Sequence, residues 1–370
     1  MIGLPLADQL GKLEFKKSNL EGPKQVFLPK SGFHMNYYER KAVNGQNTVD
    51  PTKQPTLVFF HGFSSSAREF FAFLTLLDIP DNVRILIPEQ LGHGQDLKRA
   101  FKEGDAFQQP NADLMVDSTS EFLDIMKAGT NCNALGTSFG GVLLYYLRMK
   151  RPDVIQKTVL VSPALAKCLA DPFLDGLIDG SENFVDFQSR DDVVHLFRDL
   201  LWTDPKRRST KSDVKKDPFP KFIYDFMYEL NMRDVPRGHN KGLQDSLIKA
   251  VTQSKGGDGI DDIYLAPSDI DKDSLRLVVW PEEDQICDNK KGKRFFESST
   301  ATIFESVPEC GHVFHENGKG IYELLVPKVQ EFLLDFSTRN LAEVRSRVQE
   351  VSQSTPVADS MDGRVLLDSH

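Results

Sequence analysis

The stretch NALGTSFGGVLLYYL, residues 133–147, carries the most informative pattern in this chain of 370 residues. A short apolar run changes into a helical pattern at Ser138, and glycines flank this serine in the order G-T-S-F-G from Gly136 to Gly140. Glycine costs conformational entropy in strands and in helices, so two glycines around one serine need a reason. One reason would be a tight turn that needs small residues. The other is a nucleophile elbow, in which a strand turns sharply into a helix and exposes a reactive serine.

The segments on either side of Ser138 differ in how well they suit such an elbow. The segment after it, GGVLLYYLRMKRP, has apolar residues at helical spacing and ends at Pro152, which predicts a helix. The segment before it, TNCNALG, contains asparagines, which are poor strand formers, so the pattern predicts only a weak strand. G-x-S-x-G occurs by chance in roughly one chain of this length in ten, so the rest of the chain must decide.

Composition argues against several classes of protein. The chain has 45 basic and 54 acidic residues, a net charge of −9, and no basic stripe with interleaved aromatic residues, which argues against nucleic-acid binding. Its length allows one large α/β domain with an insertion, or two domains. No apolar run approaches the ~18 to 20 residues of a membrane-spanning helix, and the first residues lack a signal-peptide pattern. A soluble, cytoplasmic protein is therefore expected.

The cysteines give no sign of a metal site or of a disulfide framework. They are scattered along the chain without the C-x-x-C or cysteine–histidine spacing of zinc sites. We therefore expect four free thiols in a reducing compartment and no bound metal. The residues concerned are Cys132, Cys168, Cys287 and Cys310.

Strand and helix patterns alternate through the first half of the chain. A hairpin is predicted at residues 25–40, and nearly continuous apolar runs, typical of buried parallel strands, follow it. Segments with helical spacing separate these runs, which predicts a mostly parallel α/β sheet with helices on both faces. The predicted strands are residues 56–60, 83–88, 158–162, 275–280 and 301–307, and the helices between and after them include residues 66–77, 113–128 and 326–336.

The alternation stops at Ser162 and resumes at Leu275. The intervening segment has amphipathic helical patterns but no strand pattern, so we predict a helical cap over the carboxyl edge of the sheet. A packing domain unrelated to any site is the alternative. The predicted boundaries are 1–164 and 271–339 for the core, 165–270 for the cap and 340–370 for a polar, disordered tail.

A serine nucleophile needs a base, and the base needs a carboxylate that orients it. In the expected fold these residues occur in the order serine, acid, histidine. The segment VVWPEEDQICD places Asp284 just after a buried strand, and VPECGHVFHE places His312 just after the next one. Loops at adjacent strand ends meet at one edge of a parallel sheet, so Ser138, Asp284 and His312 are predicted to converge.

Each of these two loops also offers alternatives. His315 lies in the same loop as His312, and Gly311 favours His312 because it permits an unusual backbone at the start of the loop. The acid loop also contains three other carboxylates. Asp284 is preferred because it lies four residues after Trp280, where the loop is still at the carboxyl edge, whereas Asp288 lies four residues farther along. The competing acids are Glu282, Glu283 and Asp288.

The segment FFHGFSSS, residues 59–66, follows a buried strand and suits the oxyanion hole of an acyl-transfer site. Preorganised backbone N–H groups at a strand-to-helix turn stabilise the oxyanion that forms on an attacked carbonyl. The predicted donors are the backbone amides of Phe63 and of Phe139, the residue after the nucleophile. An ordinary turn is the alternative interpretation of the His-Gly pair.

These motifs together resemble the α/β-hydrolase family. HGFS, GHG, GTSFGG, PDV, LVSPA, VVWPEEDQICD and ECGH occur here in the family's order, over residues 25–336. Within the family the chain most resembles the monoacylglycerol lipases of the α/β-hydrolase-domain type and related bacterial lipases. The resemblance implies an acylglycerol or related carboxylic ester as substrate, hydrolysis through Ser138, Asp284 and His312, and no cofactor.

Several alternatives remain open on the same residues. A carbon–carbon bond hydrolase, a thioesterase or an acyltransferase would use the same fold and triad. A ligand-sensing protein with a vestigial triad would bind an ester without multiple turnovers. The expected partners are a small ester or lipid substrate and, through the cap, a membrane surface, but no nucleic acid.

Overall fold

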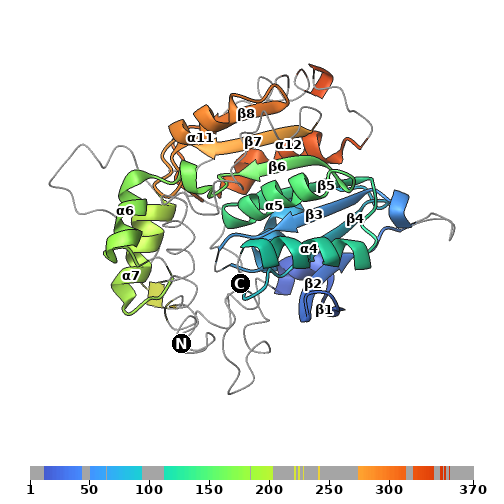
Figure 1. Cartoon of the computed structure of the whole chain (residues 1–370), viewed down its shortest axis with the longest axis horizontal. Helices are drawn as coiled ribbons and strands as arrows, with labels where there is room; N and C mark the ends of the chain where they lie inside the picture. Colours follow the sequence, from blue (N-terminus) through green and yellow to red (C-terminus); the bar gives the residue numbers. More distant parts are fainter. Residues whose placement is uncertain are drawn as a thin grey trace, which may run out of the picture.

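The core of the molecule is an eight-stranded sheet in the order β1-β2-β4-β3-β5-β6-β7-β8 (Figure 1). The first two strands are antiparallel to each other, β2 is antiparallel to β4, and the remaining strands are parallel. The computed structural model describes residues 12–43, 51–63, 65–93, 112–183, 185–202, 274–313 and 320–336, with residues 221, 224, 225, 228, 241, 342–344, 346 and 350. The strands are β1 (Glu21–Leu28), β2 (Phe33–Arg40), β3 (Thr56–Phe60), β4 (Arg84–Pro88), β5 (Cys132–Thr137), β6 (Ile155–Val161), β7 (Leu275–Pro281) and β8 (Thr302–Val307).

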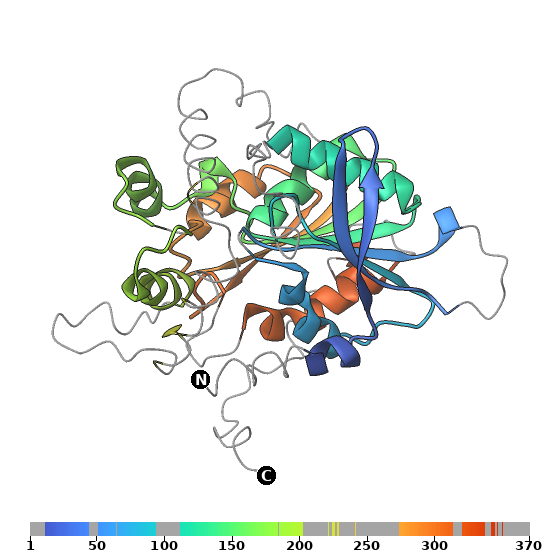
Figure 2. The same ribbon diagram turned by 90° about the horizontal axis from the view of Figure 1, so that it is seen from below.

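Helices pack on both faces of the sheet. Figure 2 shows α4 and α5 on one face and α2 and α12 on the other. Each face has its own buried apolar cluster, with Phe122 and Trp280 on the α5 side and Phe59 and Phe332 on the α12 side. The helices are α2 (Phe71–Leu76), α4 (Ala112–Ile125), α5 (Phe139–Lys150), α6 (Asp171–Asp179), α7 (Arg190–His195), α11 (Asn289–Phe296) and α12 (Ile321–Leu334), with the short helical segments η1 (Pro51–Lys53), η2 (Ala67–Phe70), η4 (Ala166–Cys168) and η5 (Leu196–Leu201).

The predicted α/β fold, the hairpin and the parallel strands are confirmed. The strand before Ser138 is stronger than its sequence indicates, because β5 is buried along its whole length between β3 and β6. The Asn133 side-chain amide donates a hydrogen bond of 2.7 Å to the carbonyl of Leu333 in α12, which satisfies a polar group inside the sheet. The predicted helix at residues 66–77 divides into the 3₁₀ turn η2 and α2.

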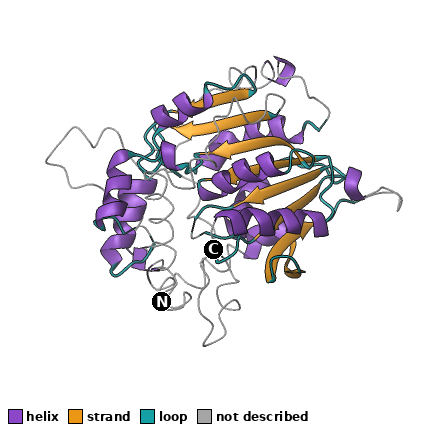
Figure 3. Cartoon of the chain, in the orientation of Figure 1, coloured by secondary structure: helices purple, strands orange, loops and turns teal. Residues whose placement is uncertain are grey.

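The inserted segment lies at the carboxyl edge of the parallel strands. In Figure 1 and Figure 3, α6 and α7 stand beyond the tips of the strand arrows. The start of the insertion pairs with the acid loop, where Ala170 N–H donates to Ile286 at 2.9 Å and Asp288 N–H donates to Cys168 at 2.7 Å. Farther along, the Leu201 carbonyl accepts a 3.1 Å hydrogen bond from the Val313 N–H. Of the amphipathic helical pattern at residues 220–230, the structure describes only residues 221, 224, 225 and 228.

The tail contributes more to the core than its composition predicts. Residues 342–344 are helical, and Val344 is only 3% exposed within the apolar cluster on the α12 face. The expectation that residues 340–370 form a disordered tail therefore does not hold at Val344. Residues 351–370 lie outside the described part of the chain.

Two further expectations concern cysteines and membrane spans. The four cysteines are all buried and free. Burial raises the pKa of Cys132, Cys168 and Cys310 to about 12, so these thiols stay protonated. Among the described residues, the helices are too short or too polar for any of them to cross a bilayer.

Candidate active site

Ser138 occupies a strained turn between β5 and α5. Its backbone angles are φ 51° and ψ −117°, a conformation that a residue with a side chain rarely adopts. Hydrogen bonds hold the turn on both sides: Ser138 N–H donates to Val161 at 2.8 Å, and Ala164 N–H donates to the Ser138 carbonyl at 3.1 Å. Strain of this kind costs on the order of 1–3 kcal/mol and is often found at active sites.

The two glycines of the motif are required by close backbone contacts. A Cβ atom on Gly136 would lie 2.3 Å from the Gly140 carbonyl oxygen, and one on Gly140 would lie 2.1 Å from that of Phe60. Both contacts are far shorter than any real Cβ contact, so neither position can hold a side chain without backbone movement. The G-x-S-x-G pattern thus reflects the packing of the elbow against β3 and α5.

Asp284 and His312 form a buried pair in the loops after β7 and β8. Their exposed fractions are 5% and 3%. Asp284 Oδ2 accepts a 2.7 Å hydrogen bond from His312 Nδ1, and Oδ1 accepts from the backbone amides of Ile286 and Cys287 at 2.9 and 2.8 Å. These bonds fix the carboxylate and keep the proton of the neutral imidazole on Nδ1, so Nε2 is left free to accept another.

The other candidate acids have different surroundings. Asp288 is the N-cap of α11 and accepts a hydrogen bond of 2.8 Å from the Lys291 amide. Glu282 is exposed, and Glu283 is partly exposed. The structure therefore brings Asp284, of the four acids, into contact with His312, while His315 lies outside the described residues. Within the described chain no hydrogen bond joins Ser138 Oγ to His312 Nε2; in ligand-free sites such bonds are often long and tighten on substrate binding.

The oxyanion loop, residues 61–63, passes beside Ser138. A Cβ atom on Gly62 would lie 3.7 Å from the Ser138 Cβ atom. The Gly62 carbonyl accepts hydrogen bonds from His61 Nδ1 at 2.9 Å and from Ser65 N–H at 3.2 Å. The carbonyl and N–H of a trans peptide point in opposite directions, so these two bonds also set the direction of the Phe63 N–H.

Phe139 stands next to this loop, as the sequence predicts. The Phe63 and Phe139 rings meet edge to face with centroids 5.4 Å apart. Phe139 opens α5, and its N–H has no acceptor among the described residues, which leaves it available at a helix N-terminus. The structure thus brings both predicted amide donors close to Ser138.

Two buried histidines, His61 and His93, pack against the oxyanion loop. The His93 ring stacks on Phe139 at 6.1 Å and lies 5.3 Å from the Phe63 ring and 5.7 Å from His61. Burial, together with His93, lowers the pKa of His61 to about 3, so His61 is neutral. Its Nε2 accepts a hydrogen bond of 3.1 Å from the Gln90 amide. Both histidines are therefore part of the scaffold.

Sequence reasoning missed a polar chain on the other side of the elbow. Glu69 in η2 accepts the Gly62 N–H at 3.0 Å, and the Tyr322 hydroxyl donates to its other oxygen. Tyr322, from α12, also hydrogen-bonds the hydroxyl of Thr137, the residue before Ser138. The available signal was a glutamate within the apolar helical pattern at residues 66–77.

Three potential metal ligands meet in the acid–histidine pair. Ligand atoms of Asp284, Cys287 and His312 lie within 4.8 Å of one another. Asp284 Oδ2 and His312 Nδ1 already bind each other, and burial raises the pKa of Cys287 well above its usual value. A protonated thiol is a poor metal ligand, so these residues fit an orienting pair better than a metal centre.

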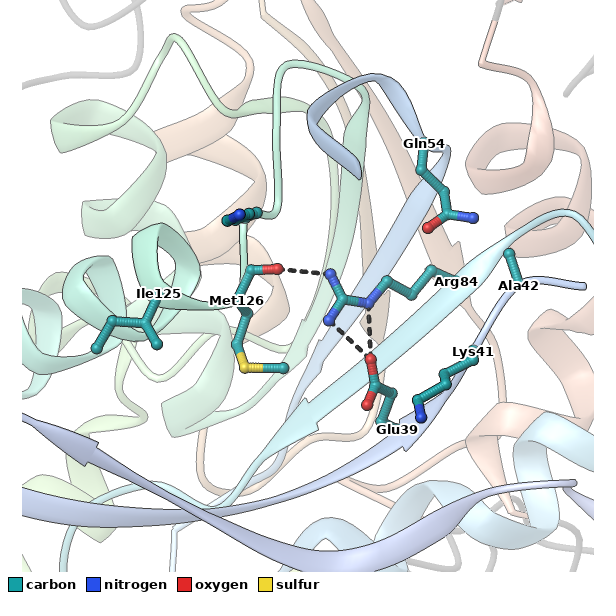
Figure 4. Close-up of a pocket in the computed structure, with 8 residues that line it drawn as sticks. Glu39, Lys41, Ala42, Gln54, Arg84, Ile125 and Met126 are labelled. Atoms are coloured by element: carbon teal, nitrogen blue, oxygen red, sulfur yellow. Dashed lines mark hydrogen bonds and ion pairs between the residues drawn. The ribbon is translucent and has the colours of Figure 1, made fainter. Parts of the chain in front are cut away.

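A cavity of about 380 Å³ lies at the opposite edge of the sheet (Figure 4). It is formed around the amino ends of β3 and β4, whereas Ser138 follows the carboxyl end of β5. Arg84 donates to Glu39 Oε1 at 2.9 and 2.7 Å and to the Met126 carbonyl at 2.6 Å. The cavity contains none of the predicted site residues; it is lined by Glu39, Lys41, Ala42, Gln54, Arg84, Ile125, Met126 and Lys127.

Comparisons with known proteins agree with the observed fold. A model described as the alpha/beta hydrolase family matches residues 57–324. A candidate lipase from Acinetobacter baumannii AYE superposes with a TM-score of 0.66 at 16% identity, covering 90% of this chain and 97% of that chain. A membrane phospholipase A, described as a bacterial virulence factor, superposes with a TM-score of 0.60 at 13% identity, covering 95% of this chain and 93% of that chain.

A third structure has a different described activity. A meta-cleavage product hydrolase from Pseudomonas fluorescens IP01 gives a TM-score of 0.52 at 16% identity, covering 78% of this chain and 90% of that chain. At these identities the likeness concerns the fold. No curated protein sequence matches the chain significantly.

Proposed function

Since this chain belongs to the alpha/beta hydrolase family, we propose that it is a serine hydrolase that cleaves carboxylic esters through an acyl-enzyme on Ser138. The observation that carries the proposal is the strained conformation of Ser138, at φ 51° and ψ −117°, at the carboxyl edge of the sheet. The hydrogen-bonded pair of Asp284 and His312 lies in loops at the same edge. A merely structural serine would not need such a turn.

The proposed reaction is a two-step acyl transfer. His312 Nε2 accepts the proton of Ser138 while Oγ attacks the ester carbonyl, and Asp284 holds the imidazole and stabilises its positive charge. The amides of Phe63 and Phe139 donate to the oxyanion. His312 then protonates the leaving alcohol, and a water molecule, activated in the same way, releases the acid from Ser138.

The proposed substrates are monoacylglycerols or related lipid esters, selected by the helical cap. Leu196 and Phe197 belong to η5, and this segment ends at the hydrogen bond between Leu201 and Val313, one residue after His312. An apolar cap segment whose end is bonded to the histidine loop suits an acyl chain. We also propose that the cap provides any peripheral membrane contact. The lipase and phospholipase descriptions of two structural neighbours are consistent with a lipid ester.

A panel of esters tests this function. Purified protein should hydrolyse p-nitrophenyl esters and 1-monoacylglycerols with multiple turnovers. Ser138→Ala should lose roughly 10³-fold or more in kcat while remaining folded, and exposed Ser298 changed to alanine should leave kcat unchanged. Ester binding without turnover would indicate a binding protein. Activity confined to thioesters, to acyl transfer or to a carbon–carbon bond would replace the ester proposal with that reaction.

The same panel tests the role of the cap. Leu196→Ala and Phe197→Ala should change the preference among acyl-chain lengths more than they change hydrolysis of a short acetate ester. Equal effects on every ester would indicate that the insertion only packs against the core.

A further inference from the structure

We propose that Glu69 is a positioning residue of this active site. Its carboxylate holds the oxyanion loop through the Gly62 N–H, and Tyr322 and Thr137 tie that carboxylate to the nucleophile elbow. The inference deepens the proposed function and rests on it, because it concerns how the two amide donors are kept in register.

Glu69 has a hydrogen-bond donor at each of its oxygens. Oε2 accepts the Gly62 N–H at 3.0 Å, Oε1 accepts the Tyr322 hydroxyl, and the Ser65 hydroxyl also donates to the carboxylate. Burial, together with Glu69, raises the pKa of Tyr322 well above its usual value, so the phenol keeps its proton and donates it. Thr137 then donates to the phenol oxygen, which makes the chain continuous from Thr137 to Gly62.

The bond to Gly62 completes the restraint on the oxyanion loop. His61 and Ser65 hold the Gly62 carbonyl, and Glu69 holds its N–H, so the peptide units on both sides of this glycine are fixed. Glycine has the widest choice of backbone conformations of any residue. Without Glu69, the peptide unit before Gly62 would lose its restraint, and only the bonds from His61 and Ser65 would hold the peptide unit that carries the Phe63 N–H.

The polar chain also connects the two halves of the oxyanion hole. Phe63 belongs to the loop after β3, and Phe139 follows Ser138 at the end of β5. Both amides must lie about 2.7–3.1 Å from one developing oxyanion, so the spacing between these loops is critical. The chain from Gly62 through Glu69 and Tyr322 to Thr137 links the two loops.

The surroundings of Glu69 favour a carboxylate over an amide. Burial raises the pKa of Glu69 above its usual value, and hydrogen bonds from Tyr322 and the Gly62 amide, with the charge of a protonated His312, offset this rise only in part. A glutamine has only one acceptor oxygen, so its NH₂ group would face either the Gly62 N–H or the Tyr322 hydroxyl.

A trifluoromethyl ketone provides the test, because Ser138 would bind it as a tetrahedral adduct whose oxyanion occupies the hole. In Glu69→Gln we expect the Ki of this ketone to rise about 10- to 100-fold and kcat to fall by a similar factor. KM should stay within about twofold, since substrate and transition state are affected differently. The matched control is Glu323→Gln, a neighbouring exposed glutamate on α12, which should change neither quantity.

The variant Tyr322→Phe removes only the hydroxyl group. It provides a second test of the proposal if Glu69→Gln does not fold. It should raise Ki and lower kcat in the same direction, and the double variant should be no worse than Glu69→Gln because both act through one carboxylate. A fall in the melting temperature with unchanged Ki and kcat, in either variant, would overturn the proposal and leave Glu69 as a loop support.

The wild-type protein separates this inference from the proposed function. If it forms the ketone adduct on Ser138 but hydrolyses no ester, the ester proposal fails, and the ratio of Ki values still decides the role of Glu69. If it forms no adduct on Ser138, both proposals are overturned.

Discussion

The two edges of the central sheet hold their carboxylates in contrasting ways. At the amino edge, Glu39 is bound by two permanent cations, the Arg84 guanidinium and the Lys24 ammonium at 2.9 Å. At the carboxyl edge, Asp284 is bound by two backbone amides and by the His312 imidazole. The first arrangement neutralises a charge permanently. The second orients a group that can gain and lose a proton.

The pKa of Glu39 illustrates the amino-edge arrangement. Burial alone would raise this pKa, but the hydrogen bonds and charges of Lys24 and Arg84 outweigh burial and lower it. The cavity lies at this edge, while the strained serine and the acid–histidine pair lie at the other. The identity of the groups that satisfy each carboxylate therefore distinguishes the two edges.

The largest effect should follow from changing the carboxyl-edge acid. Asp284→Asn should lower kcat on the order of 10⁴-fold with little loss of stability, because the amide would hold His312 in the wrong tautomer. The matched control is Asp288→Asn, since asparagine caps a helix about as well as aspartate does and should keep kcat within a few-fold. Kinetics on one ester would measure both. If Asp288→Asn were the damaging change, or if both variants stayed active, the assignment of the acid would be wrong.

The amino edge should respond in the opposite manner. Arg84→Met breaks a largely buried ion pair and leaves Glu39 with Lys24 alone, so unfolding free energy should fall by about 3–5 kcal/mol. Denaturant titration would measure this loss, and Glu21→Gln, at the exposed partner of Lys24, should leave the midpoint unchanged. The kcat per folded molecule should also stay the same. A lower kcat in Arg84→Met would mean that the two edges are coupled.

The third prediction concerns the neutral histidine behind the oxyanion loop. His61 has a pKa of about 3 in the folded protein, below its usual 6.5. Below pH 6.5 the His61 imidazole binds a proton in the unfolded chain but not in the folded chain, so the free energy of unfolding falls as the pH drops toward 3. The loss should reach about 2 kcal/mol by pH 5. Denaturant titrations at pH 7 and pH 5 should show a smaller difference in His61→Gln; an equal difference would contradict the assignment.

The smallest expected effect lies in the cap. The hydrogen bonds that His195 donates to Asp199 and Glu182 raise its pKa to about 9, so it is cationic at neutral pH and unsuited to act as a base. Its stabilisation is fully present below pH 6.5 and is lost as the pH rises through 9. Because the histidine is 42% exposed, solvent reduces this contribution to about 0–1 kcal/mol. An NMR titration should show a lower pKa in Asp199→Asn; an unchanged pKa would contradict this pairing.

Much of the fold could be predicted because each buried parallel strand is a short apolar run, as at residues 56–60 and 275–280. The strand before Ser138 was harder, since the side-chain NH₂ group of Asn133 donates to the carbonyl of Leu333, which is distant in the sequence. Val344 was missed for a similar reason: its burial depends on the rest of the core. The local sequence pattern does not predict such long-range contacts.

The residues of the candidate site also fall into two groups, those that the local sequence pattern predicts and those that depend on long-range packing. Ser138, Asp284 and His312 follow strand ends, so topology alone brings their loops to one edge. Glu69 and Tyr322 lie in helical segments, where a lone polar residue resembles a surface position. Their meeting depends on the packing of α12 beside η2 and β5, which sequence spacing does not reveal.

The most direct test of the central claim is the position at which a fluorophosphonate reacts. After labelling of the folded protein, peptide mass spectrometry should find a single adduct on Ser138, and Ser138→Ala should remain unlabelled and inactive toward esters. An adduct on a different serine, or ester hydrolysis that persists in Ser138→Ala, would contradict the account.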